Sequence, residues 1–227
     1  MTTISERRPD MGARRQLSEE VESYIRNELL SGGFKTGEYL RVETLASQIG
    51  ISPTPIREAL QVLRTQGFFE LVPRRGFRVL ELRRSDIEDI NLTQTFLAGE
   101  LARRAATRLT DEQIAELSEI DEALTRASVT KDGATYQRLN REFHRIINRS
   151  ADAPKLTMLL KVVLFYIPQK FFETTGIYPP PDDRRDLLAA IGARDPERTE
   201  SAMRELITRS GERYEGYLDE QGLLGPQ

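Results

Sequence analysis

The sequence has 227 residues, of which 38% are hydrophobic and 30% are charged, and its formal net charge is −3. This composition is typical of a soluble globular protein that is long enough for one large domain or two smaller ones. No run approaches the roughly 18 to 20 apolar residues that a membrane span requires. The chain contains no cysteine, which excludes disulfides and thiolate metal sites. We therefore expect a cytoplasmic protein without a membrane partner.

The charge is distributed unevenly along the chain. Residues 1–80 contain 12 Lys and Arg against 10 Asp and Glu, whereas residues 81–227 contain 21 against 26. A mildly basic first part and an acidic second part fit DNA binding by the first part alone. The difference is small, so by itself it is weak support for a nucleic-acid partner.

The first sixteen residues are polar, with four arginines and no apolar core segment. They are not typical of a secretory signal, and we expect residues 1–16 to form a disordered arm. The arm is either a solvated tail or a source of contacts to the minor groove or the phosphates of DNA.

Three helical patterns follow the arm. The first begins at Ser18 and ends at Gly32, and the second occupies residues 42–49. The third has Thr54 as its expected N-cap and Pro55 at its first helical position, which is the preferred place for proline.

Two β-prone runs, residues 68–72 and 77–80, then flank the turn Pro73-Arg74-Arg75-Gly76. Two such runs around a four-residue turn with glycine predict a β-hairpin. Three helices followed by a hairpin are the element order of a winged helix-turn-helix, which we place in residues 17–80.

After Leu80 the strand signals stop, and the remaining pattern is helical. We expect helices at residues 85–108, 111–127, 133–150, 154–175, 182–192 and 195–218. The predicted fold class is therefore mainly α, with an N-terminal winged helix-turn-helix and a C-terminal antiparallel all-α bundle at residues 85–218.

The start of the third helix has the residues that a DNA-reading helix needs at the end that enters the major groove. Ser52 and Thr54 offer hydroxyls, and the helix N-terminus itself attracts a phosphate. Arg57 can form a bidentate contact with a guanine or a phosphate. The alternative is that Arg57 only pairs with a nearby carboxylate such as Glu58 or Glu43.

The hairpin turn is the second candidate for DNA contact. Arg74 and Arg75 offer two guanidinium groups at its tip, and Gly76 allows the backbone to approach DNA closely. The alternative is an ordinary solvated loop. Behind a helix-turn-helix, we favour a wing that contacts DNA.

The run Ala46-Ser47-Gln48-Ile49-Gly50-Ile51-Ser52-Pro53-Thr54-Pro55-Ile56-Arg57-Glu58-Ala59-Leu60 resembles the signature of GntR-family regulators. Gly37 with Leu40, and the turn through Phe77, also match that family, so the resemblance covers about residues 17–80. It implies that DNA is contacted by Ser52, Thr54, Arg57, Arg75 and Gly76. One departure is Pro53, because the family usually has a base-reading Arg at that position.

The second part, about residues 85–215, resembles the helical FCD domain of the FadR-like branch of that family. The resemblance rests on Asn140-Arg141-Glu142-Phe143-His144 and on Leu187-Leu188-Ala189-Ala190-Ile191 followed by Arg194-Asp195. It implies a domain that binds a small-molecule effector and forms a homodimer.

Many members of this branch hold a divalent metal with one Asp and three His. This chain has a single histidine, His144, and it has Asn140 where the Asp is common. Alignment on the motifs places Arg184 and Leu206 where the other two His would lie. We therefore exclude an intact site of that type and expect neither a metal nor another cofactor.

The arginine at a lost ligand position suggests a different chemistry. We hypothesise that Arg184, with Asn140 and His144, binds an anionic effector such as a carboxylate directly. The alternatives are that Arg184 is a surface residue beside Asp182, Asp183 and Asp186, and that His144 is an ordinary core residue.

Two further features bear on the effector. Phe96 stands where the branch often has an Arg, which leaves a less polar ligand as an alternative. Tyr166 and Gln169 belong to the apolar run from Met158 to Phe172, which either lines a cavity or is plain core.

We do not expect an enzyme, because no catalytic motif or phosphate-binding loop is present and His144 is the only histidine. The expected function is a transcription regulator, a repressor rather than an activator, that binds double-stranded operator DNA as a homodimer. An effector would change the placement of the two winged domains and weaken operator binding. The alternative is a winged-helix module for protein interaction.

Overall fold

The computed structural model describes residues 11–168 and 171–225. By its internal contacts the chain divides into two compact units. The first contains the residues up to Leu82 together with residues 223–225, and the second contains residues 83–222.

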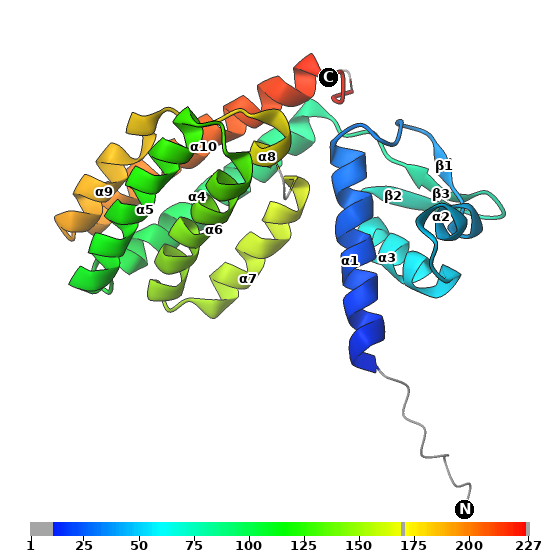
Figure 1. Ribbon diagram of the computed structural model, residues 1–227, viewed down its shortest axis with the longest axis horizontal. Coiled ribbons are helices and arrows are strands. Elements are labelled where there is room, and N and C mark those ends of the chain that lie inside the picture. The colour runs from blue at the N-terminus through cyan, green and yellow to red at the C-terminus, as the bar shows by residue number, and fades with distance from the viewer. Residues whose placement is uncertain (1–10, 169–170, 226–227) are drawn as a thin grey trace, which may run out of the picture. The chain divides into compact units, whose positions relative to one another are not determined.

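The first unit is a small helical domain with a three-stranded antiparallel sheet, in the strand order β1-β3-β2 (Figure 1). Its elements are α1 (Met11–Leu30), β1 (Tyr39–Leu40), α2 (Val42–Ile49), α3 (Pro53–Thr65), β2 (Phe69–Val72) and β3 (Gly76–Val79). The hairpin pairs Val72 with Gly76 and Leu71 with Phe77. The predicted winged helix-turn-helix is confirmed.

The core of this unit forms because the apolar residues of α1 and α3 recur at helical spacing and face each other. Ile25 of α1 and Ile56, Leu60 and Leu63 of α3 are fully buried. Phe69 of β2 is also buried, and side chains alternate across a strand, so its neighbour Glu70 is partly exposed. The packing of α1 and the sheet against α3 holds α3 in place.

Three local expectations in this unit were wrong. The first helix begins at Met11, so residues 11–16 belong to α1 rather than to an arm, and residues 1–10 lie outside the described part. Ser18 lies inside that helix, where its hydroxyl donates to the Glu58 carboxylate at 2.6 Å instead of capping the helix. The arginine, glutamine and leucine before Ser18 are good helix formers, which explains the longer helix.

The N-cap of α3 is Ser52, with Pro53 at the first helical position, rather than Thr54 with Pro55. Proline fixes φ at a helical value and has no N–H to satisfy, so either proline is suited to that place. The first of the two sets the boundary, which moves Thr54 into the first turn of the helix.

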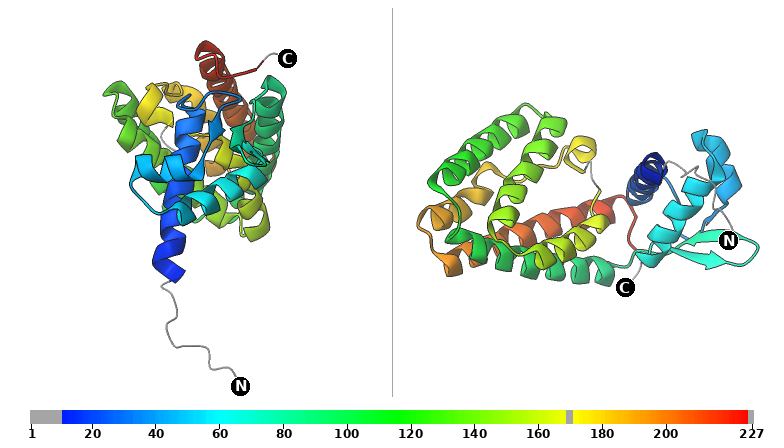
Figure 2. Two further views of the ribbon diagram at one scale, coloured as in Figure 1. Left: turned by 90° about the vertical axis from the view of Figure 1, so that its right-hand side faces the viewer. Right: turned by 90° about the horizontal axis from the view of Figure 1, so that it is seen from below.

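The second unit is all helical (Figures 1 and 2). Its elements are α4 (Arg84–Ala106), α5 (Asp111–Val129), α6 (Gly133–Ser150), α7 (Pro154–Val163), η1 (Leu164–Tyr166), α8 (Phe171–Thr175), η2 (Pro181–Arg184), α9 (Arg185–Gly192) and α10 (Pro196–Glu220). The predicted all-α bundle is confirmed.

Local signals fix several helix starts in this unit. Thr110 caps α5 by accepting from the Gln113 backbone N–H at 3.2 Å, while the Gln113 side chain accepts from the Thr110 N–H at 3.0 Å. Asp195 caps α10 in the same position by accepting from the Arg198 N–H at 3.1 Å. Each of these bonds satisfies a backbone donor that a helix start leaves without a partner.

The long helix expected over residues 154–175 was wrong. The chain instead forms α7, the short turn η1 and, after Pro168, the separate helix α8. Proline lacks the N–H that continues a helix and disfavours a helical residue before it. The expected helix at 182–192 likewise divides into η2 and α9.

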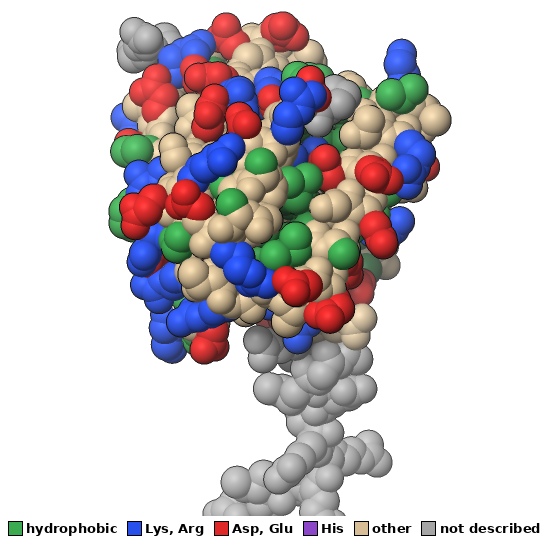
Figure 3. Space-filling view, turned by 90° about the vertical axis from the view of Figure 1, so that its left-hand side faces the viewer, with side chains coloured by type: hydrophobic (Ala, Val, Ile, Leu, Met, Phe, Trp, Pro, Cys, Tyr) green, Lys and Arg blue, Asp and Glu red, His purple; other side chains and the backbone are tan. Residues whose placement is uncertain are grey.

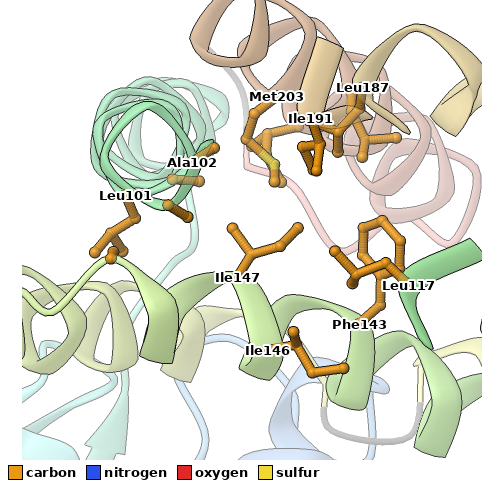
Figure 4. Close-up of a cluster of buried hydrophobic side chains, with 14 of the residues drawn as sticks. Leu101, Ala102, Leu117, Phe143, Ile146, Ile147, Leu187, Ile191 and Met203 are labelled. Atoms are coloured by element: carbon orange, nitrogen blue, oxygen red, sulfur yellow. The ribbon is translucent and has the colours of Figure 1, made fainter. Parts of the chain in front are cut away.

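The core of the bundle collects side chains from all the long helices (Figure 4). Leu101 and Ala102 of α4 and Phe143 and Ile147 of α6 belong to this cluster, and all four are fully buried. Other members of this cluster are Leu117, Ile146, Leu187, Ile191 and Met203. This core holds α5, α6 and η2 together, and these elements carry Asp121, Asn140 and Arg184.

Candidate nucleic-acid interface and effector site

The start of α3 presents its polar side chains to solvent. Ser52 and Thr54 are exposed, and the Ser52 hydroxyl makes no capping hydrogen bond. Their neighbours Pro55 and Ile56 are buried, which fixes the orientation of the helix in its unit. An exposed helix N-terminus with unused hydroxyls is suited to receive a phosphate.

Arg57 lies one turn further along α3, and its side chain is 62% exposed. Its Nη2 is 3.5 Å from Oε1 of Glu43, which is itself exposed. An ion pair of this kind in water contributes little, so it does not prevent Arg57 from binding another anion. Arg57 thus does pair with Glu43, as the alternative held, but the contact is weak and the guanidinium stays accessible.

Along the same side of α3 lies a shallow surface hollow. It is lined by Pro53, Thr54, Arg57, Glu58, Gln61 and Val62. Pro53 offers no donor here, in contrast to the Arg that the family usually has. The side-chain donors that line the hollow are those of Thr54, Arg57 and Gln61.

The tip of the hairpin carries the two predicted arginines. Arg74 has a positive φ of 66°, and Arg74 and Arg75 are both exposed. The Arg75 guanidinium lies 5.5 Å from the centre of the Tyr39 ring, and its Nη1 donates to the Tyr39 hydroxyl at 3.5 Å. Strand β1 therefore orients Arg75 through a cation–π contact.

Gly76 has a reason in the fold itself. Its φ is 105°, and a Cβ at this position would lie 2.4 Å from the carbonyl oxygen of Leu40. Only glycine allows β1 to approach the hairpin this closely. The glycine thus shapes the wing whatever its part in DNA binding.

In the helical unit, Figure 3 shows a face on the side of α5 and α9 where basic and acidic side chains are interspersed. Interspersed charges of this kind are typical of a solvated surface rather than of a nucleic-acid contact. One charged side chain of this unit, that of Arg184, is buried.

Arg184, at the end of η2, has a side chain that is only 3% exposed. Its Nη2 donates to the Tyr136 hydroxyl at 2.7 Å and to Oδ1 of Asn140 at 3.1 Å. Its Nη1 lies 3.5 Å from Oδ1 of Asp121. The alternative of a surface arginine was therefore wrong, because the chain turns Arg184 inward.

We call Arg184 and its neighbours Asp121, Tyr136, Asn140 and His144 the Arg184 cluster. Aromatic rings lie on the guanidinium group of this arginine. The centres of the Tyr136 and Phe143 rings lie 5.7 Å and 5.6 Å from its central carbon. Its Nε is buried and has no hydrogen-bond partner among the described residues. A buried charge with an unused donor is costly unless a further acceptor reaches it.

Burial shifts the pKa values of the groups around Arg184. It raises the pKa of Asp121 more than the positive charge of Arg184 lowers it, and it also raises the pKa of Tyr136. Burial and, second, Arg184 lower the pKa of His144 to about 4, so this imidazole is neutral at pH 7. The guanidinium is therefore surrounded by neutral groups and by one carboxylate at the limit of contact.

The cluster does not fit the divalent metal that the family resemblance suggested. Within residues 11–168 and 171–225, no three His, Asp or Glu residues come together as possible ligands. The Arg184 guanidinium, a fixed cation, stands among the donors and would repel a metal ion. The chemistry of this cluster favours an anion.

The structure thus brings Arg184 and Asn140 together, with the His144 imidazole close enough to feel the charge of Arg184. Tyr166 lies on η1, where its carbonyl oxygen accepts from the Tyr214 hydroxyl at 2.9 Å. Gln169 lies outside the described residues.

Sequence reasoning missed three residues of these sites. Tyr136 is four residues before Asn140, so helical spacing could have found it on the same face. Asp121 and Tyr39 reach their partners Arg184 and Arg75 across long sequence separations. The spacing of nearby residues in the sequence does not predict such long-range contacts.

A winged helix-turn-helix with exposed polar residues on its recognition helix, followed by a helical unit with a buried cationic cluster, defines a DNA-binding transcription regulator. Residues 17–79 match the bacterial regulatory proteins of the gntR family, and residues 92–209 match the FCD domain. The chain belongs to the GntR family of regulators, in the group that has an FCD domain.

Curated relatives support this over most of their length. The chain is 28% identical to the HTH-type transcriptional regulator McbR of Escherichia coli (strain K12), over 86% of this chain and 90% of that protein. It is 25% identical to the probable D-xylose utilization operon transcriptional repressor of Paenarthrobacter nicotinovorans, over 84% and 85% of the two chains.

The solved structure of E. coli McbR/YncC superposes with a TM-score of 0.68 at 26% identity, covering 91% of this chain and 98% of that one. These relatives are transcription regulators. No helix in the described part of this chain has the length and apolar character to cross a membrane.

Proposed function

We propose that this regulator binds a palindromic operator as a homodimer and represses transcription until a small anionic effector, of the carboxylate class, binds at Arg184 without a metal. The observation that carries the effector proposal is the Arg184 cluster. It holds a guanidinium that is 3% exposed, has an unused Nε and faces mostly neutral groups.

Two surfaces of the first unit support the DNA contacts. Ser52, Thr54 and Arg57 lie exposed at the start of α3, which in this architecture enters the major groove. Arg74, Arg75 and Gly76 form the wing tip, where Tyr39 holds the Arg75 guanidinium in a defined orientation. The winged unit would therefore contact DNA at both places.

The chemistry of arginine supports a carboxylate effector. A guanidinium has five N–H donors in a fixed plane and binds carboxylates with two parallel hydrogen bonds. Three described acceptors meet Nη1 and Nη2, and Nε remains unused. Asn140 and the neutral His144 would supply further polar contacts at the edge of the same group.

A shift between two arrangements of the dimer explains how such binding would reach the operator. The effector favours whichever arrangement it binds more tightly, and it can change DNA affinity only by that difference. Repression is the direction we propose, in line with the Paenarthrobacter relative that is named a probable repressor.

The effector proposal is tested by thermal unfolding of the purified protein against a panel of small organic acids, with and without EDTA. An acid at about 100 times its Kd adds about 2.7 kcal/mol to the free energy of unfolding, a shift of several degrees in Tm. We expect that shift to be the same with EDTA. Loss of the shift in EDTA would show that a metal is bound.

Isothermal titration with variants assigns the acid to its site. Arg184→Lys keeps a charge but loses the planar donor pair, so the acid should bind at least about tenfold more weakly. Arg185→Ala is the matched control, because Arg185 is the next residue, is 69% exposed and pairs with Asp182 on the surface. Unchanged affinity in the Arg184 variant would overturn the proposed site.

A further inference from the structure

The Arg184 cluster is closed to solvent. Arg184 and Tyr136 are only 3% and 1% exposed. The effector of the proposed function therefore reaches the guanidinium only if part of the chain that covers the cluster moves. The long helices around it belong to the core of the bundle, so the cover that moves has to be a shorter segment.

Residues 172–178, which we call the strap, cover the Tyr136 side of the cluster. The ring centres of Phe172 and Tyr178 lie 4.7 Å and 4.9 Å from that of Tyr136. The two strap rings are nearly parallel, with their centres 6.4 Å apart. Both strap side chains are partly exposed whereas Tyr136 is buried, so these rings lie between Tyr136 and solvent.

The strap is anchored at both ends by buried residues. Phe171, just before it, is buried, and the ring centres of Tyr214 and Tyr217 on α10 lie 5.4 Å and 5.6 Å from its own. Pro179, just after it, is also buried. Between these anchors, Gly176 is exposed and has a positive φ of 66°, which glycine adopts without strain. The middle of the strap can therefore swing outward while its two ends stay in place.

A hydrogen bond and close packing hold the strap against the start of α6. The backbone N–H of Phe172 donates to Oε1 of Gln137 at 3.2 Å. Gly133 allows α8 to approach, because a Cβ at that position would lie 2.6 Å from Cα of Glu173. Since Phe172 is tied to α6 through its backbone, Tyr178 is the ring that we expect to be displaced.

Displacement of Tyr178 leaves one side of the Tyr136 ring without its aromatic neighbour. Aromatic rings in contact stabilise each other beyond the area that they bury, so a ligand with its own ring restores this contact. The buried Nε of Arg184, which has no hydrogen-bond partner among the described residues, can then donate to the ligand's carboxylate. A saturated acid would satisfy the arginine but not the ring.

We propose that the effector is an aromatic carboxylate, whose ring replaces that of Tyr178 against Tyr136 while its carboxylate pairs with Arg184. Without effector, the strap fills the site with its own ring. This inference rests on the carboxylate effector of the proposed function and names its chemical class.

The first measurement compares acids that differ in the ring alone. Benzoate and phenylacetate are titrated calorimetrically into the full-length protein at pH 7, beside cyclohexanecarboxylate and cyclohexylacetate, which have the same charge and nearly the same size. The saturated rings are the more hydrophobic, so tighter binding of an aromatic acid reports ring packing rather than burial alone. We expect the better aromatic acid to bind about three- to tenfold more tightly than its saturated counterpart.

The outcomes of this comparison separate the two proposals. Equal or tighter binding of the saturated acids would overturn the aromatic class. Binding of short aliphatic acids such as malate, without binding of the aromatic acids, would also overturn it and would leave the carboxylate effector intact. If no acid binds, both this inference and the carboxylate effector fail.

The second measurement tests the exchange of rings. Tyr178→Ala removes the ring that the effector has to displace, so the better aromatic acid should bind about three- to tenfold more tightly than to wild type. Tyr178→Phe keeps the ring and should bind as wild type does. Circular dichroism checks that each variant is folded. Unchanged or weaker binding in the folded Tyr178→Ala protein would overturn the exchange.

The third measurement opens the strap by a separate route. In Gly133→Ala the added methyl group overlaps Glu173, so the same acid should associate several-fold faster in stopped-flow mixing. Gly216→Ala on α10 is the matched control, because a Cβ there meets no atom within 4 Å, and its rate should equal that of wild type. Equal rates in the two variants would show that the strap does not control entry.

Discussion

Arg57 of the winged unit and Arg184 of the helical unit each lie 3.5 Å from one carboxylate oxygen. The side chain of Arg57 is 62% exposed and that of Arg184 is 3% exposed. In water the first pair is weak and easily exchanged for a phosphate. Inside the bundle the second charge depends on each neighbour that it contacts. The same distance therefore describes an arginine suited to bind DNA and an arginine that holds its own domain together.

The largest effect expected from this contrast is on stability. Arg184→Ala leaves Asp121, Tyr136 and Asn140 without their shared partner, so the free energy of unfolding of the helical unit should fall by about 2 to 4 kcal/mol. Urea unfolding followed by circular dichroism measures this. The exposed neighbour provides the control, because Arg185→Ala should change the value by less than about 0.5 kcal/mol. Equal losses in the two variants would remove the contrast.

The next effect is on DNA binding. Arg57→Ala should weaken operator binding by about 10- to 100-fold, since it removes a charged contact that is made only with DNA. It should leave stability nearly unchanged. Fluorescence anisotropy over a range of salt concentrations measures both affinity and the number of phosphate contacts. Arg64→Ala, on the last turn of the same helix, should bind within a few-fold of wild type. A loss as large in that control would mean that net charge alone matters.

The third effect is a pH dependence that only the buried cluster should show. The pKa of His144 is lowered from 6.5 to about 4, so between these values the unfolded chain binds a proton that the folded chain does not. The free energy of unfolding should therefore fall as pH decreases from about 6.5 to about 4 and should be unaffected by this group above that window. We expect a contribution of about 1 to 3 kcal/mol.

His144→Gln isolates this contribution, because Asp121, whose pKa shifts in the opposite direction, is present in both proteins. The difference in stability between wild type and variant should change with pH only inside the window. Parallel profiles from pH 4 to pH 7 would show that the imidazole is not shielded as the structure indicates.

The smallest effect concerns the wing. Tyr39→Ala removes the ring on which Arg75 lies, and operator affinity should fall by about two- to fivefold, as an exposed cation–π contact contributes about 0.5 to 1 kcal/mol. Tyr39→Phe keeps the ring and should lose less. In the Arg75→Ala background, Tyr39→Ala should have no further effect. Independent losses from the two positions would show that Tyr39 does not act through Arg75.

Local sequence patterns predicted most of the fold, because helix periodicity, capping residues and turn glycines act over a few neighbours. The helices expected at residues 111–127 and 195–218 are α5 and α10, whose starts are capped by Thr110 and Asp195. The misses have local causes as well. Strand β1 has only two residues, and Pro168 divides a run whose apolar spacing continues on both sides.

The residues of the two sites likewise differ in how far the sequence predicted them. The residues at the start of α3 and in the wing were named from sequence because they are consecutive and carry a family signature. Arg184 was named from its position, but its acceptors Tyr136 and Asp121 come from two other helices. Such clusters depend on tertiary packing, which a single sequence does not show.

Gly76 has a consequence for how operator recognition could diverge among relatives. The glycine is required by the approach of Leu40 within its own domain, so the path of the hairpin is fixed independently of what it touches. Arg75 next to it is exposed and its φ is not positive, whereas the positive φ of Arg74 restricts what can replace that residue. If the wing contacts DNA as proposed, a substitution at Arg75 would change the preferred operator without changing the path of the hairpin.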